Sequence, residues 1–142
     1  MDVSKGDVVR RLIFLVGALA LSACTDSTGP IATLDGTYDL KTVNGAALPY
    51  TTFQNATRKE ELLSDVISAS DGSFFQFTSN RVTINGQVDD GMSPNSGSYA
   101  IDGTAVTFTS LSGTTWTGTI SGDTLTMPFT VPTGGTGVYV RR

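Results

Sequence analysis

Side chains that could do chemistry are few in this chain of 142 residues, which contains no His and a single Cys, Cys24. Without His the chain lacks the most common general base, the usual partner of a nucleophilic Ser or Cys, and the commonest zinc ligand. Because no nucleophile can be paired with a base, we predict that the chain is not an enzyme and has no catalytic residue. We also predict no cofactor.

Carboxylates are the remaining route to catalysis or metal binding. Asp89-Asp90-Gly91, with Asn95 nearby, offers oxygen ligands of the kind that calcium binds, but the spacing matches no EF-hand. The same residues are typical of a solvated loop, so we predict a loop and no metal site. We interpret Glu60, Glu61 and Asp65 as surface charges rather than an acid–base pair, because nothing in the sequence indicates burial.

Cys24 stands in a specific context. Arg10-Arg11 is followed by the apolar run Leu12–Leu21 and then by Leu21-Ser22-Ala23-Cys24. This order of a basic segment, an apolar run and small residues is typical of a secretory signal. The apolar run is shorter than the roughly 20 residues that cross a bilayer. The tetrapeptide resembles the bacterial lipobox, which implies cleavage before Cys24 and lipidation of its sulfur; an ordinary signal with an accidental Cys is the alternative.

The chain therefore divides into a signal peptide over 1–23, which we expect to be helical, a flexible tether over 24–34 and a folded domain over 35–142. Two or three acyl chains on Cys24 would hold the domain stably on a membrane. Thr25, rather than the Asp that retains enterobacterial lipoproteins in the inner membrane, follows the Cys. We therefore expect a lipid-anchored envelope protein at the outer membrane, facing the periplasm.

The folded domain has an all-β composition. Thr occurs 22 times after residue 24, and Thr favours strands. Asn-Gly, Asp-Gly and Ser-Gly dipeptides separate short runs of alternating polarity, which is the pattern of hairpin-linked strands. Thr57–Ser68 also fits a helical face, although we prefer a strand. The predicted strands are Thr37–Val43, Leu62–Ala69, Phe74–Ser79, Val82–Val88, Ser98–Ile101, Ala105–Thr109, Thr114–Ile120, Thr124–Thr130 and Gly137–Arg141.

The hairpins in the second half keep one apolar face and one Thr face in phase, which indicates an antiparallel sheet. Eight or nine sequential short strands predict an all-β fold, an antiparallel up-and-down β-barrel of about eight strands, with a two-sheet sandwich as the alternative. Gly36-Thr37-Tyr38 is similar to the Gly-x-Trp that opens lipocalins, with Tyr in place of Trp. The stretch from Gly36 to Pro49 resembles the opening of small bacterial lipocalin-like (calycin-type) lipoproteins. The resemblance implies a lipocalin-like barrel with an interior site and names no ligand.

Seven aromatic side chains are predicted to point into this barrel as candidate ligand-binding residues: Tyr38, Phe75, Phe77, Tyr99, Phe108, Trp116 and Phe129. They either line a pocket for a small hydrophobic ligand or fill a narrow barrel. In the second case the chain would be a protein-interaction or inhibitor lipoprotein that acts on an envelope protein through its loops. An interior cavity of about 300 Å³ or more would favour the ligand. A filled interior with an exposed aromatic patch would favour the interaction.

The charge balance disfavours nucleic acid as a partner. After Cys24, six Lys and Arg stand against eleven Asp and Glu. Binding to phosphates requires clustered Lys and Arg, which this segment lacks.

Overall fold

The computed structural model describes residues 33–129 and 134–142. The signal helix predicted over 1–23, the lipidation site Cys24 and residues 25–32 of the predicted tether lie outside these residues. The described part is made of ten strands and contains no helix. They are β1 (Gly36–Val43), β2 (Ala46–Ala47), β3 (Tyr50–Gln54), β4 (Arg58–Ser70), β5 (Ser73–Ile84), β6 (Gln87–Asp102), β7 (Ala105–Ser110), β8 (Thr115–Ser121), β9 (Thr124–Pro128) and β10 (Thr136–Arg141).

No helix within the described ranges is long and apolar enough to cross a membrane.

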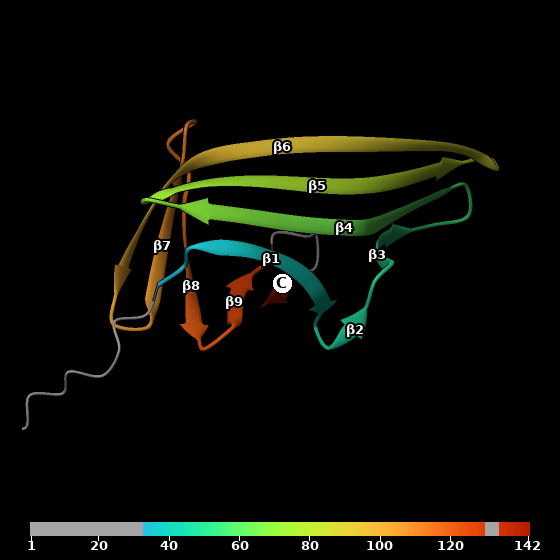
Figure 1. The fold of residues 1–142 in the computed structure, drawn as a ribbon. Coiled ribbons are helices and arrows are strands. Elements are labelled where there is room, and N and C mark those ends of the chain that lie inside the picture. Colours follow the sequence, from blue (N-terminus) through green and yellow to red (C-terminus); the bar gives the residue numbers. More distant parts are fainter. Residues whose placement is uncertain (1–32, 130–133) are drawn as a thin grey trace, which may run out of the picture. The chain divides into compact units, whose positions relative to one another are not determined.

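Eight of the strands close into a barrel (Figure 1). Strands β4 to β10 follow one another as antiparallel neighbours, and β10 pairs with β1. The ring closes where residues 36–39 of β1 pair with residues 66–69 of β4. The fold is therefore the predicted antiparallel up-and-down barrel, consistent with a lipocalin-like fold, and the sandwich alternative is wrong.

Strands β2 and β3 lie between β1 and β4 in the chain and leave one end of the barrel open. β2 pairs with Thr42 and Val43 at the end of β1, whereas β3 pairs with residues 59–62 at the beginning of β4. Beyond Asp39 and Val66, β1 and β4 are no longer paired with each other. The barrel is therefore closed by direct strand pairing at one end only.

The predicted turn dipeptides connect the two strands of each hairpin. Asn44, Asp71 and Asn85 have φ values of 52°, 49° and 49°, and each precedes a Gly that also has a positive φ. Two consecutive residues with positive φ form the type I′ turn, whose twist matches that of the adjoining strands. Asn, Asp and Gly tolerate this conformation, which explains why these dipeptides occur where strands reverse.

The core fills the closed part of the barrel. Tyr38, Val106, Phe108, Leu125 and Tyr139 are completely buried there. Leu34, the last residue of the predicted tether, is also completely buried in this core. The predicted faces of β7, β8 and β9 are confirmed, because the apolar positions point inward and the Thr positions outward. Burial of these apolar side chains is the main driving force for the fold.

Strands β5 and β6 form a hairpin that is longer than the predicted strands (Figure 1). The predicted break between Ser79 and Val82 is absent, and the chain reverses at Asn85-Gly86, inside the predicted strand Val82–Val88. β6 continues through the predicted loop at Asp89-Asp90-Gly91. Its first half is exposed, so it carries no alternating apolar pattern from which a strand could be predicted.

The carboxylates in that predicted loop belong to a strand. Successive side chains of a strand point to opposite faces, so Asp89 and Asp90 do not converge. Asp90 accepts two hydrogen bonds from Arg81 of β5, from Nε at 2.7 Å and from Nη2 at 2.8 Å. The loop prediction is therefore wrong, and Asp90 forms an ion pair across the β5–β6 hairpin.

Candidate ligand-binding site

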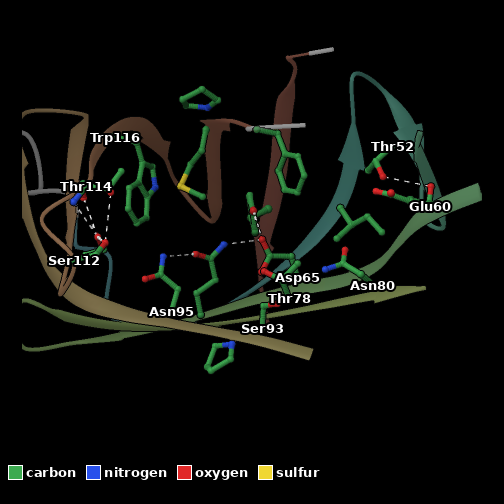
Figure 2. A pocket seen from close by; sticks show the side chains of 18 of the residues that line it. Thr52, Glu60, Asp65, Thr78, Asn80, Ser93, Asn95, Ser112, Thr114 and Trp116 are labelled. Carbon is green, nitrogen blue, oxygen red and sulfur yellow. Dashed lines mark hydrogen bonds between the residues drawn. The ribbon is translucent and has the colours of Figure 1, made fainter. Parts of the chain in front are cut away.

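A cavity of about 790 Å³ occupies the open part of the barrel (Figure 2). Strands β4, β5 and β6 form one wall, and β8, β9 and β10 contribute residues to the other. The cavity exceeds the roughly 300 Å³ at which a pocket can enclose a small molecule. It combines a polar floor on β4, β5, β6 and β10 with apolar side chains on β8 and β9.

The floor is built around Asp65, which is only 1% exposed. Its position results from a bulge in β4: Leu62 pairs with Asn80 and Ser64 with Ser79, so Leu63 is an extra residue. The bulge changes which residues of β4 face inward from even to odd numbers. The interpretation of Asp65 as a surface charge is therefore wrong, because a strand without the bulge would place Asp65 outside.

Asp65 accepts hydrogen bonds from three neutral side chains. Gln76 Nε2 donates to Oδ2 at 2.7 Å, and Thr78 Oγ1 donates to Oδ1 at 3.1 Å. Tyr139 OH donates to Oδ2 at 2.7 Å from β10, across the barrel interior. No Lys or Arg among the described residues forms an ion pair with Asp65. A buried carboxylate is thus held by neutral donors instead of a cation.

Burial perturbs both members of the Asp65–Tyr139 pair. Loss of hydration raises the pKa of the Asp65 carboxyl above its ordinary value, and the hydrogen bonds from Tyr139, Gln76 and Thr78 oppose this change. Burial and the adjacent carboxylate both raise the pKa of Tyr139 well above that of a free phenol. Tyr139 therefore keeps its proton and acts as a hydrogen-bond donor.

The network continues along the floor of the cavity. Asn95 Nδ2 donates to Gln76 Oε1 at 3.4 Å, which links β6 to β5 and β4. Within the described residues, no buried side-chain nitrogen or oxygen lacks a hydrogen-bond partner. A fully connected network of this kind is rigid, so it presents a fixed pattern of polar atoms to the cavity.

Trp116 forms the aromatic wall (Figure 2). Its ring stacks on Phe108 with centroids 5.5 Å apart and meets Phe74 edge to face at 5.6 Å. Nearby, Ser110 Oγ accepts a hydrogen bond from the amide of Thr114 at 3.0 Å, which holds the connection between β7 and β8. Trp116 is partly exposed toward the cavity, and its position is fixed from behind by the core.

The structure places the seven predicted aromatic residues in three environments. Trp116 and Phe129 line the cavity. Phe108 and Tyr38 are completely buried in the core, and Tyr99 is partly buried, with its hydroxyl donating to Asp35 at 2.7 Å. These three do not line the cavity.

Phe75 and Phe77 lie on the outer face of β5, so the prediction that they point inward is wrong. They are 41% and 42% exposed, and their rings meet at 4.5 Å. The turn at Asp71-Gly72 pairs Ala69 with Phe74, and Phe74 is the residue of β5 that enters the core. Alternation along β5 then places Phe75 and Phe77 outside and Gln76 and Thr78 inside.

Sequence reasoning missed the polar floor of Asp65, Gln76, Asn95 and Tyr139. An isolated Asp within a predicted strand was the available signal, since a charged residue there either faces solvent or is held by a buried network. Its partners come from strands far apart in the sequence.

The chain matches no protein-family model, and neither a curated protein nor a solved structure matches it.

Proposed function

We propose that this protein is a lipid-anchored protein of the bacterial envelope, not an enzyme, whose barrel holds a small, largely apolar molecule in its open end. The cavity of about 790 Å³ is the observation that supports this proposal. Trp116, Met127 and Phe129 provide apolar contact area, and the network around Asp65 provides a few oriented polar atoms. This combination is characteristic of small-molecule sites.

The chain has its own reporter for this proposal, because Trp116 is the only Trp in the sequence and lines the cavity. Titration of the full chain with 1-octanol, a soluble apolar probe, should change Trp116 emission with saturation. The variant Phe129→Ala, which removes a lining ring, should weaken binding. Phe77→Ala, which removes a ring from the outer face, should leave it unchanged. Emission that does not respond to 1-octanol or to its charged analogues would refute ligand binding.

The anchor is proposed from the sequence around Cys24. Its outer-membrane destination rests on Thr25 following the Cys. Mass spectrometry of the native protein should show Cys24 as an acylated N-terminus, and Cys24→Ala should release the protein from membranes. A Cys24→Ala protein that remains membrane-bound, or a native N-terminus at an unmodified Met1, would contradict the proposal.

A second candidate function is recognition of an envelope protein. The outer-face pair of Phe75 and Phe77 favours it, because two adjacent exposed aromatic rings are typical of interaction surfaces. This candidate predicts that a crosslink to an envelope partner disappears in Phe77→Ser and persists in Phe129→Ala. A crosslink that persists in Phe77→Ser and disappears in Phe129→Ala would show that the partner contacts the cavity.

A further inference from the structure

The hydrogen-bond network of the cavity floor has a direction. An ionised carboxylate can only accept hydrogen bonds, so its neighbours must give it their protons. The hydroxyl hydrogens of Thr78 and Tyr139 are both directed at Asp65. Each hydroxyl can then offer a further partner only an oxygen lone pair. Asp65 therefore converts the surrounding hydroxyls into acceptors.

The same constraint orients the amides. Gln76 directs Nε2 to Asp65, which turns its Oε1 toward Asn95. Asn95 in turn directs Nδ2 to Gln76, so its own Oδ1 points away from that bond. The polarity set at Asp65 thus passes through Gln76 to Asn95. Each amide nitrogen keeps a second hydrogen, so the feature that sets this floor apart is the negative charge of Asp65.

The charges of the residues that line the cavity favour the same kind of ligand as the direction of the hydrogen bonds does. The described residues that line the cavity include Glu60, Glu61 and Asp65 but no Lys or Arg. Lys59 Nζ lies 2.7 Å from Glu61 Oε1. Arg58 lies 2.6 Å from Glu60 at the rim, whereas Asp65 on the floor has only neutral partners. An anion placed on this floor would be repelled by the carboxylate of Asp65. A cation would be attracted in a medium of low dielectric constant.

From this arrangement, and given the proposed ligand-binding function on which the inference rests, we propose that the ligand is a cationic amphiphile. Its protonated amine lies on the floor near the carboxylate of Asp65, and its apolar part lies against Trp116 and Phe129. The aromatic wall also suits a cation, because the face of an indole ring attracts positive charge. Fatty acids and other carboxylates are disfavoured by the negative charge of Asp65.

Three probes with one apolar chain test the inference: octylammonium, 1-octanol and octanoate, each titrated into the full chain at neutral pH with Trp116 emission as readout. We expect octylammonium to bind at least about tenfold more tightly than octanoate, with 1-octanol between them. Octanoate that binds as tightly as octylammonium would overturn the charge preference and leave the proposed ligand site intact. Failure of all three probes to bind would overturn the proposed function itself.

Substitutions test whether the preference for a positively charged probe depends on the residues of the cavity floor. Asp65→Asn should reduce octylammonium affinity about tenfold or more and bring the three probes closer together. Asp102→Asn removes the same charge from the exposed last residue of β6 and should change nothing. Asn95→Lys leaves Asp65 in place and adds the opposite charge, so it should abolish the preference for octylammonium, which keeps the test available if Asp65→Asn does not fold. Unchanged probe order in Asn95→Lys and in folded Asp65→Asn would refute the inference.

Discussion

Arg141 contacts Tyr38 in two ways at the closed end of the barrel. Its Nε and Nη2 atoms donate to the Tyr38 hydroxyl at 3.0 Å and 2.7 Å, and its guanidinium carbon lies 5.3 Å from the centre of the Tyr38 ring. Nη2 also donates to the carbonyl of Thr33 at 2.9 Å. One side chain from the last strand thus joins the first strand to the segment that precedes it.

Arg141→Met should lower the free energy of unfolding by about 2 kcal/mol, because it leaves the hydroxyl of a completely buried Tyr38 without its donors. Urea unfolding followed by Trp116 emission measures this loss. The matched control is Arg142→Met, which removes an exposed pair with Asp39 and should lower the midpoint much less. Equal losses in the two variants would show that the contact with Tyr38 has no special role.

Asp65 makes the stability of the barrel depend on pH in a defined direction. The pKa of Asp65 is raised in the folded protein above its ordinary value of 3.8, so the folded state binds this proton more tightly than the unfolded state. The corresponding stabilisation is present below about pH 4 and is lost as the pH rises through the raised pKa.

Asp65→Asn should therefore gain stability relative to the wild type as the pH is raised from 4 to 7. The pKa values of Asp39 and Asp90 are lowered by Arg142 and Arg81, so they stabilise the fold above their ordinary pKa and stop doing so as the pH falls. Both groups are present in both proteins, so their effect cancels in the difference. Parallel pH profiles from urea unfolding would contradict the buried position of Asp65.

Tyr139→Phe removes one donor from the buried carboxylate and should cost about 2 kcal/mol of unfolding free energy. It should also raise the pKa of Asp65 further, because the hydrogen bond from Tyr139 lowers that pKa. Tyr50→Phe is the control, since the Tyr50 hydroxyl only accepts an exposed 3.3 Å hydrogen bond from Asn44. A Tyr139→Phe protein as stable as Tyr50→Phe would mean that Asp65 does not need this donor.

Two glycines of β6 provide a sharp comparison. A Cβ atom on Gly97 would lie 1.9 Å from the carbonyl oxygen of Thr109 on β7, whereas one on Gly91 would meet nothing within 4 Å. Gly97→Ala should therefore destabilise the barrel by about 3 kcal/mol or more, because backbone must move. Gly91→Ala should be neutral or stabilising by about 0.5 kcal/mol. Thermal unfolding of both variants distinguishes these outcomes, and similar melting temperatures would contradict the close approach of β6 and β7.

The parts of the fold that could be predicted from sequence are those in which short-range patterns act alone. Asp102-Gly103 and Ser121-Gly122 separate strands whose alternation is regular, and the hairpins over Ala105–Pro128 form as expected. The β1–β4 pairing that closes the ring joins Gly36 to Ala69 and has no local signal beyond the barrel topology itself.

The candidate site was harder to predict because it depends on the bulge at Leu63. One extra residue exchanges the inner and outer faces of β4, and it also explains why Thr57–Ser68 has no clean strand period. On β5, the predicted inward-facing residues were shifted by one position. Phe75 and Phe77 are hydrophobic and alternate correctly, yet the alternation that enters the barrel is that of Phe74, Gln76 and Thr78. A prediction based on hydrophobicity alone therefore placed the outer face of β5 inside the barrel.

Among the described residues, the first ten residues of β6 are paired with β5 alone, because pairing with β7 begins at Gly97. A strand with a bare side is a template on which a second chain can add, and such addition leads to aggregation. Pro94 has no amide hydrogen to offer there, and Asp89 and Asp90 bring negative charge to the same stretch. The long hairpin can therefore extend the wall of the cavity without recruiting neighbouring copies into fibrils.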